Sequence, residues 1–234
     1  MMDLVQSFSK LPAFGIFITV GIYIIALKIS EKTKIAILNP LLVTSTVVVL
    51  FLLILGIKYD DYNKGGIYIT FLIGPSTIAL VVNLYKNLDL LKRNFLAIFI
   101  GVIAGVITAI VSVFLMTKLV GLEGDLRISL VPKSLTTAIG VSISEEFGGI
   151  ASITVFAIIL TGIIGAVISP FVFKVFRIRD RVAKGIGLGT ASHAVGTSKA
   201  IQMGEVEGAM SGLSIALAGF ISVILIPIFI SIFK

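Results

Sequence analysis

Six long apolar runs set the strongest limit on how this chain can fold. They cover residues 11–27, 35–57, 67–85, 95–117, 150–173 and 207–233. Each run approaches or exceeds the roughly 20 residues that a helix needs to cross the hydrocarbon core of a bilayer. Because lipid cannot satisfy exposed backbone polar groups, runs of this length cross a membrane as α-helices. The sequence therefore predicts an all-α polytopic membrane protein with about six full transmembrane helices.

The composition supports a membrane protein and argues against several other classes. Only 13% of the residues are charged and the mean hydropathy is +1.15, whereas soluble domains carry roughly 25% charged residues. The net charge of +7 comes from basic residues in short loops between apolar runs, which is typical of topology signals and not of nucleic-acid binding. The absence of cysteine and the single histidine exclude a disulfide framework and argue against a metal or cofactor site.

The loop charges predict the orientation of the chain in the membrane. The loops after the first, third and fifth runs hold more lysine and arginine than the loops on the opposite side. The side richer in basic residues is usually cytoplasmic. We therefore expect a single transmembrane domain over residues 1–234, with both termini extracytoplasmic.

Two further segments, residues 131–149 and 185–204, do not read as ordinary spanning helices. Both contain fewer apolar residues than the six long runs, both are rich in Gly, Ser and Thr, and both carry charged residues. If residues 131–149 crossed the membrane fully, the strongly basic loop at 174–184 would lie outside, against the charge rule. We therefore expect both segments to be re-entrant or broken helices.

These two segments also resemble each other. Residues 136–144 read TTAIGVSIS and residues 192–200 read SHAVGTSKA, so both carry a hydroxyl, Ala, a β-branched residue, Gly and Ser in the same order. Paired unusual segments are a sequence pointer to a transporter binding site and favour an inverted-repeat carrier fold. A helix broken inside the membrane presents free N–H groups and a positive dipole end, which suit a carboxylate.

The polar side chains of these segments are the candidate site for a small organic anion. Lys199 is the candidate counter-ion, and His193 is the candidate proton link because its unperturbed pKa is near 6.5. Structural alternatives stay open: His193 bonds a carbonyl to pin a helix break, Lys199 snorkels to the interface, and the hydroxyls bond their own helices. The candidate hydrogen-bonding residues are Ser134, Thr136, Thr137, Ser192, Thr197 and Ser198.

The acidic pair Glu145 and Glu146 at the end of the first unusual segment is a candidate for binding a coupling cation or proton. An acidic pair at an outer mouth is the alternative interpretation. We expect no enzymatic activity, because Ser192 and His193 are adjacent and diverge on a helix, and no carboxylate stands where it could orient the base. Glycines every four residues from Gly204 to Gly212 favour close helix packing, which allows a homodimer.

Three motifs carry a resemblance to a known family. They are LNPLL at 38–42, PKSLTT at 132–137 and, most specifically, GTASHAVGT at 189–197. In this order they resemble the LrgB/CidB family of bacterial membrane proteins, along nearly the whole chain. The resemblance implies one of two functions.

The first implied function is an ion- or proton-coupled secondary transporter of small monocarboxylates such as pyruvate, glycolate, glycerate or lactate, because plastid relatives resemble glycolate and glycerate carriers. The alternative is an antiholin- or holin-like regulator of murein hydrolase activity and lysis, acting with an LrgA/CidA-type membrane partner. The bottom-up interpretation favours the transporter, since hydroxyls, helix ends and Lys199 are what a carboxylate needs.

Overall fold

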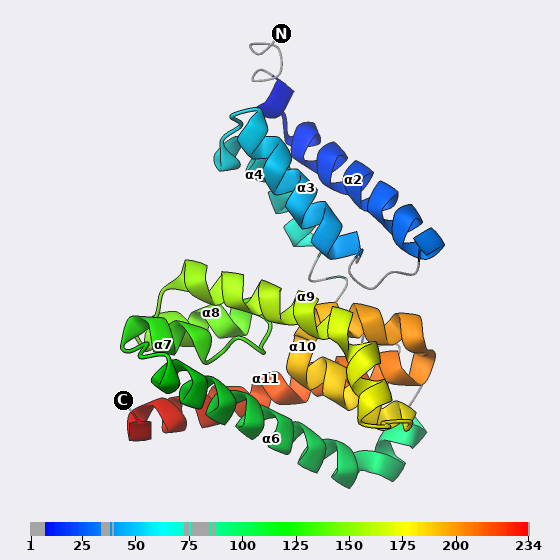
Figure 1. The fold of residues 1–234 in the computed structure, drawn as a ribbon, viewed down its shortest axis with the longest axis vertical. Helices are drawn as coiled ribbons and strands as arrows, with labels where there is room; N and C mark the ends of the chain where they lie inside the picture. The colour runs from blue at the N-terminus through cyan, green and yellow to red at the C-terminus, as the bar shows by residue number, and fades with distance from the viewer. Residues whose placement is uncertain are drawn as a thin grey trace. The chain divides into compact units, whose positions relative to one another are not determined.

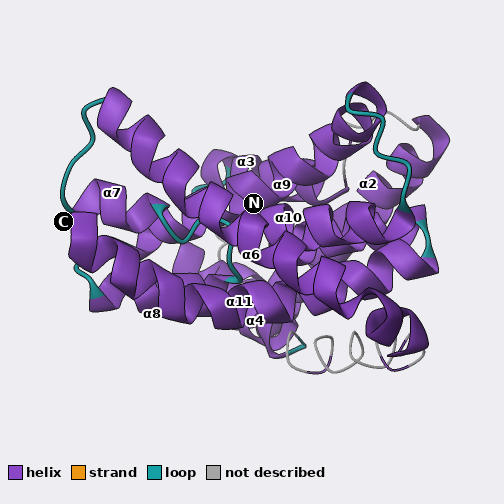
Figure 2. Ribbon diagram, turned by 90° about the horizontal axis from the view of Figure 1, so that it is seen from below, coloured by secondary structure: helices purple, strands orange, loops and turns teal. Residues whose placement is uncertain are grey.

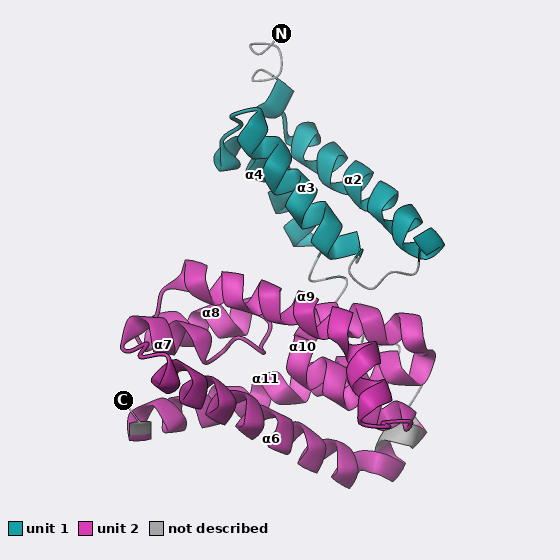
Figure 3. Cartoon of the chain, viewed as in Figure 1, with its two compact units in different colours: residues 1–79 teal, residues 80–234 magenta. Residues whose placement is uncertain are grey.

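The computed structural model describes residues 8–33, 38, 40–72, 75, 85 and 88–233. Its long elements in these ranges are all α-helices, and no strand occurs among the described residues (Figures 1 and 2). The predicted all-α class is therefore confirmed. Backbone contacts divide the chain into two compact units, residues 1–79 and 80–234 (Figure 3). The single-domain expectation stays a prediction.

The first unit contains three helices, α2 (Pro12–Thr33), α3 (Pro40–Ile54) and α4 (Tyr59–Phe71). Helices α2 and α4 cross closely where Gly15 meets Gly65, since a methyl group at Gly65 would lie 2.8 Å from the backbone nitrogen of Ile16. α4 begins well before the apolar run expected at 67–85. Asp60 and Asp61 occupy its first turn, where acidic side chains favour the positive end of the helix dipole.

Four described helices are long and apolar enough to cross a membrane. They are α2 in the first unit and, in the second, α6 (Leu88–Leu119), α9 (Ala151–Val175) and α11 (Glu205–Phe233). The spans predicted at 11–27, 95–117, 150–173 and 207–233 are thus confirmed. The runs at 35–57 and 67–85 lie partly outside the described residues, so the total of six spans stays a prediction.

Residues 131–149 belong to a re-entrant structure that we call hairpin 1, residues 125–149. It consists of α7 (Asp125–Leu130), a turn, and α8 (Thr137–Glu146). The two arms meet at their base, where the Ser129 hydroxyl accepts a hydrogen bond from the Ile150 N–H at 2.7 Å. They also meet near the tip, where a methyl group at Gly140 would lie 3.3 Å from the Pro132 carbonyl oxygen. The chain therefore turns back at the tip, and hairpin 1 begins and ends at the same end of the second unit, as predicted for a re-entrant segment.

Residues 185–204 form most of a second re-entrant structure, hairpin 2, which is α10 (Arg181–Met203). The helix breaks at His193, whose φ of 42° and ψ of −135° are not helical. Gly196 lies directly against the Leu188 carbonyl, although eight residues of straight helix would separate them by about 12 Å. The chain therefore reverses at His193 and divides hairpin 2 into a first arm, residues 181–192, and a second arm, residues 194–203.

The contacts of hairpin 2 with α11 show the direction of each arm. A methyl group at Gly185 would lie 2.7 Å from the Met210 Cβ, and Gly189 lies against Ser211. The contacts advance in the same direction along both helices, so the first arm runs parallel to α11. The second arm runs antiparallel to it, because Ile201 packs on Gly208. Gly208 thus serves a contact within the chain, and the homodimer stays a prediction.

The helices of the second unit follow an inverted order. α6 runs parallel to the first arm of hairpin 2, since Gly101 faces Ile186 and Gly105 faces Thr190. α9 runs antiparallel to the first arm of hairpin 2. Gly165 contacts Ser192, whereas a methyl group at the earlier Gly187 would lie 4.0 Å from the ring of the later Phe173. Hairpin 1 follows α6 and hairpin 2 follows α9, so the two hairpins enter from opposite ends. This order agrees with the expected inverted-repeat carrier fold.

We call the end of the unit that holds the α9–α10 loop the basic end, because Lys174, Arg177, Arg179 and Arg181 gather there in sequence. Hairpin 2 enters from the basic end and hairpin 1 from the opposite end. Their tips reach the middle of α9, where His193 contacts Gly162. The fold therefore brings the two unusual segments together far from either end of the helices.

A candidate anion site at the hairpin tips

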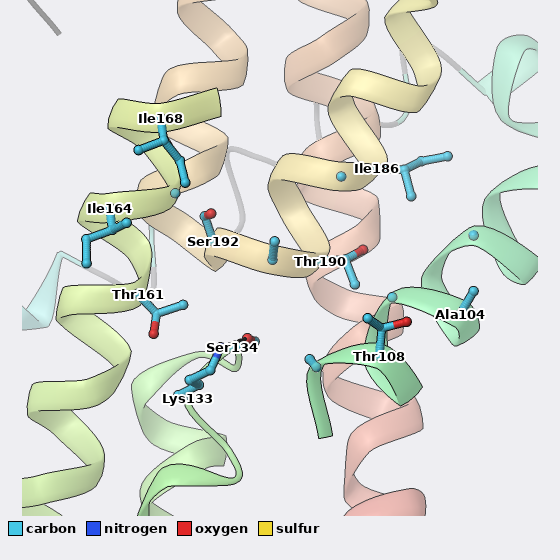
Figure 4. A pocket seen from close by; sticks show the side chains of 16 residues that line it. Ala104, Thr108, Lys133, Ser134, Thr161, Ile164, Ile168, Ile186, Thr190 and Ser192 are labelled. Atoms are coloured by element: carbon cyan, nitrogen blue, oxygen red, sulfur yellow. Dashed lines mark hydrogen bonds between the residues drawn. The ribbon is translucent and has the colours of Figure 1, made fainter. Parts of the chain in front are cut away.

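A cavity of about 600 Å³ lies between the helices of the second unit, next to both hairpin tips (Figure 4). Its polar lining consists of Lys133 and five hydroxyl side chains, and the hydroxyls come from four different elements. The remaining lining is glycine, alanine and isoleucine, which includes Gly101, Gly105 and Gly165. The five hydroxyl side chains are Thr108, Ser134, Thr161, Thr190 and Ser192.

Lys133 brings the one charged side chain in this lining. It sits in the turn at the tip of hairpin 1 and is half-buried, with its Nζ 3.4 Å from the Ser134 Oγ. Within the described residues no carboxylate lies within 4.0 Å of this ammonium group, since the ion pairs found there join Lys64 to Asp61 and Arg181 to Glu207. A cation without a counter-ion at membrane depth is a candidate binding group for an anion.

Thr190 supplies a second polar group that the protein leaves unused. The residue is only 5% exposed, and its Oγ1 has no hydrogen-bond partner. A methyl group at Gly105 would lie 2.6 Å from the Thr190 Cγ2, so glycine is needed for this approach. Buried hydroxyls almost always find a partner, so this Oγ1 is an unsatisfied polar atom in the wall of the cavity, although the atom itself is closed off from the cavity space.

His193 lies beside the cavity and not in its lining. The residue is 5% exposed, and its Nε2 is 2.8 Å from the Ile158 carbonyl oxygen. Because a carbonyl only accepts, Nε2 carries the hydrogen and donates it. Gly162 makes room for the ring, since a methyl group there would lie 2.6 Å from Cε1. This geometry matches the structural alternative, in which His193 bonds a carbonyl of a neighbouring helix, here α9, and so fixes the helix break in place. The proton-link role stays a prediction.

Of the hydroxyls predicted from the sequence, Ser134 and Ser192 line the cavity. Thr197 is buried elsewhere, with its Oγ1 2.7 Å from the Ser211 Oγ, and ties hairpin 2 to α11. Ser198 is exposed and donates to the Ala194 carbonyl of its own helix at 3.2 Å. Ser198 therefore bonds its own helix, which is the structural alternative stated for the hydroxyls.

Five other predicted residues lie outside the cavity lining. Thr136 is at the N-cap position of α8 without a capping side-chain hydrogen bond, and Thr137 next to it is exposed. Lys199 is on the second arm of hairpin 2, past the tip. The Glu145–Glu146 pair is exposed at the end of α8 away from the tip. The structure does not bring Lys199 or the acidic pair to the cavity, and their roles stay predictions.

Sequence reasoning missed four lining residues. Lys133 belongs to the PKSLTT motif, so a signal was present, but a lysine in a loop between apolar runs is also typical of a topology signal. Thr190 lies inside the GTASHAVGT motif and could have been found there. Thr108 and Thr161 stand alone in apolar spans, and nothing in the pattern distinguishes them from threonines that bond their own helix.

Comparisons with known proteins agree on one family. The model of the LrgB-like family matches residues 19–232. The protein named Antiholin-like protein LrgB from Bacillus subtilis (strain 168) is 37% identical over 94% of this chain and 95% of its own length. Those of Bacillus cereus (strain B4264) and Bacillus anthracis (strain CDC 684 / NRRL 3495) are each 36% identical over 93% of this chain and 95% of theirs. No solved structure matches the chain. The match over most of the chain shows that this protein belongs to the LrgB-like family.

Proposed function

We propose that this protein is a membrane carrier for small organic anions, which bind in the cavity at the hairpin tips. The observation that carries the proposal is the Lys133 ammonium, which faces a lining of neutral hydroxyls and no carboxylate. A carboxylate ligand would accept hydrogen bonds from Lys133 and from lining hydroxyls such as Ser134. Hydrogen bonds to charged groups contribute about 1.5–3 kcal/mol each, which is enough to select an anion over a neutral solute.

The surroundings of the cavity favour a carrier over an open pore. Ile168, Ile186 and Gly187 line the cavity on its basic-end side. Towards the opposite end the space is filled by a buried apolar cluster that includes Val113, Leu135 and Ile143. Towards the basic end Phe173, Leu188 and Ala200 form another buried apolar cluster, and a site between packed clusters fits a carrier better than an open pore.

Uptake into proteoliposomes tests the proposal. Radiolabelled pyruvate, glycolate, glycerate and lactate would be offered with and without an imposed pH gradient. We expect saturable uptake of at least one acid, lost in Lys133→Gln and kept in the matched control Lys199→Gln, because only Lys133 lines the cavity. Absence of uptake for all four acids, or equal uptake by Lys133→Gln, would count against the carrier. Stimulation by the pH gradient would identify proton coupling.

A second candidate function is antiholin-like control of murein hydrolases and lysis, together with a small LrgA/CidA-type membrane partner. The names of the relatives support it more directly than they support transport. It predicts that the protein alters the permeability of vesicles to dyes or protons when the partner is present. It also predicts that Lys133→Gln has no effect on that permeability. Opposite results in the two assays separate the candidates.

The location follows from the fold and the family together. The long apolar helices make this an integral membrane protein. We propose the bacterial inner membrane, with the basic end of the second unit cytoplasmic and both termini extracytoplasmic. Cysteines introduced near each terminus and labelled from outside with a membrane-impermeant maleimide test the orientation, because the chain has no native cysteine.

A further inference from the structure

Glu207 is a buried carboxylic side chain at the base of hairpin 2. Its side chain is 6% exposed, and it is the one buried acidic residue in the part of the chain that the structure describes. Taking a carboxylate out of water costs free energy unless a partner compensates for the lost hydration. An ionisable side chain enclosed in a membrane protein is therefore a candidate for function.

The surroundings of Glu207 provide little such compensation. Among the described residues its Oε2 finds no hydrogen-bond partner. Its Oε1 lies 4.0 Å from the Nε of Arg181, whose side chain is 73% exposed, and an ion pair with one partner in water is weak. Arginine stays charged throughout the working pH range, so Glu207 is the member of this pair that can gain a proton.

The position of Glu207 in the first turn of α11 does not explain its burial. Acidic side chains stabilise the positive end of a helix dipole, and Glu205 does so from an exposed position in the same turn. Gly204 lies directly against the Glu207 Oε2, and a side chain there would displace the carboxyl group. The break between α10 and α11 therefore has room for an enclosed carboxyl group that the helix end does not need.

We infer that Glu207 binds the coupling proton, so that one proton crosses the membrane with each anion. The inference rests on the proposed carrier function, because it names the group that links the same cavity to a pH gradient. Of the acidic residues in the second unit, the sequence candidates Glu145 and Glu146 are exposed. Glu207 instead combines enclosure with an oxygen atom that is free to hold a proton.

The charges of the second unit explain why a proton should accompany the anion. In the empty protein the Lys133 ammonium in the cavity and the Glu207 carboxylate carry opposite charges. An anion bound to Lys133 alone would leave one negative charge in excess among the helices, and enclosed charge is costly in a membrane. A proton on Glu207 removes this charge, so the loaded and the empty protein carry the same net charge.

The first arm of hairpin 2 connects Glu207 with the cavity. A methyl group at Gly185 would lie 2.6 Å from the Glu207 carbonyl oxygen. The next two residues, Ile186 and Gly187, line the cavity. The arm thus contacts α11 at Glu207 and forms part of the cavity wall within three consecutive residues. A change of charge at Glu207 therefore acts on the element that shapes the anion site.

The pH dependence of pyruvate binding to the protein in nanodiscs tests the inference. If each anion brings one proton, the affinity falls as the pH rises, by up to about tenfold in Kd for each pH unit. Glu207→Gln imitates the protonated carboxyl group, and its Kd should not change with pH. The matched control is Glu205→Gln, an exposed residue of the same helix turn, which should keep the pH dependence of the wild type.

Proton counting on the wild type needs no variant. In a weakly buffered suspension with a pH indicator, pyruvate binding should take up about one proton per anion, because uptake on binding and the pH dependence of affinity are linked. In proteoliposomes Glu207→Gln should exchange external for internal pyruvate, but an imposed pH gradient should no longer drive accumulation.

The outcomes separate this inference from the proposed function. Pyruvate binding to the wild type without proton uptake would overturn the inference and leave the carrier standing, and so would a Glu207→Gln protein that still accumulates pyruvate along a pH gradient. Loss of the pH dependence in both Glu207→Gln and Glu205→Gln would also overturn it. A wild type that neither binds nor takes up any of the four acids would refute the proposed function, and the inference with it.

Discussion

The packing of hairpin 2 on α11 can be tested with two substitutions only two residues apart, Gly189→Ala and Gly187→Ala. A methyl group at Gly189 would meet the Ser211 backbone, with the Ser211 Cα at 2.9 Å. A methyl group at Gly187 would have the Phe173 ring as its nearest neighbour, at 4.0 Å, which is an ordinary van der Waals contact. Both residues are helical, so the two variants differ mainly in what the new methyl group touches.

The expected magnitudes follow from two opposing effects. Alanine is favoured over glycine in a helix by about 1 kcal/mol, and this gain is common to both variants. Overpacking costs about 1–3 kcal/mol, and it applies only to Gly189→Ala, because α11 backbone cannot give way as a flexible side chain can. We therefore expect Gly187→Ala to stabilise the protein slightly, and Gly189→Ala to be about 1–3 kcal/mol less stable than Gly187→Ala.

Thermal unfolding of the purified protein in detergent, followed by far-ultraviolet circular dichroism, measures the difference. For a chain of this size 1 kcal/mol corresponds to about 2–4 °C in Tm, so the two variants should differ by about 2–12 °C. Equal melting temperatures, or a higher one for Gly189→Ala, would show that the first arm of hairpin 2 does not pack on α11 as described.

Three further predictions concern other contacts. Thr154→Val removes the buried hydrogen bond to Ser144 and leaves that hydroxyl without its donor, so the free energy of unfolding should fall by about 1–3 kcal/mol in the same melting assay. Gly65→Ala should destabilise the first unit while Gly21→Ala should not, because a methyl group at Gly65 meets α2 backbone and one at Gly21 meets nothing within 4 Å; comparable melting temperatures would contradict the close crossing of α2 and α4. His193→Ala removes the bond to the Ile158 carbonyl and should lower the melting temperature by an amount matching about 1–3 kcal/mol, so an unchanged melting temperature would contradict this contact between hairpin 2 and α9.

Much of the fold of the second unit follows from the sequence, because apolar run length and loop charge are direct consequences of the bilayer. The expected spans at 95–117, 150–173 and 207–233 each lie within a helix or within a residue of one. The re-entrant nature of 131–149 and 185–204 follows from the same rule, since polar backbone at membrane depth must be enclosed by protein. Helix ends were less predictable: α6 begins at Leu88, where polar residues extend the helix beyond its apolar part.

The site was harder to predict, because spacing along the chain does not say which face of a broken helix points into a cavity. The motif that contains His193 led to the right place, yet the ring itself bonds to Ile158, and its neighbours Thr190 and Ser192 line the cavity. The cation came from the other hairpin. Lys133 and Lys199 look alike as isolated lysines in unusual segments, and only the meeting of the two tips distinguishes them.

Direct binding of radiolabelled pyruvate to the protein in nanodiscs, for the wild type and Lys133→Gln, tests the central claim that the cavity is an anion site. The loss of one charge-assisted hydrogen bond, about 1.5–3 kcal/mol, predicts a Kd about 10- to 150-fold weaker, and Lys199→Gln should bind like the wild type. Equal affinities of the wild type and Lys133→Gln would contradict the account, and so would a loss of binding in Lys199→Gln alone.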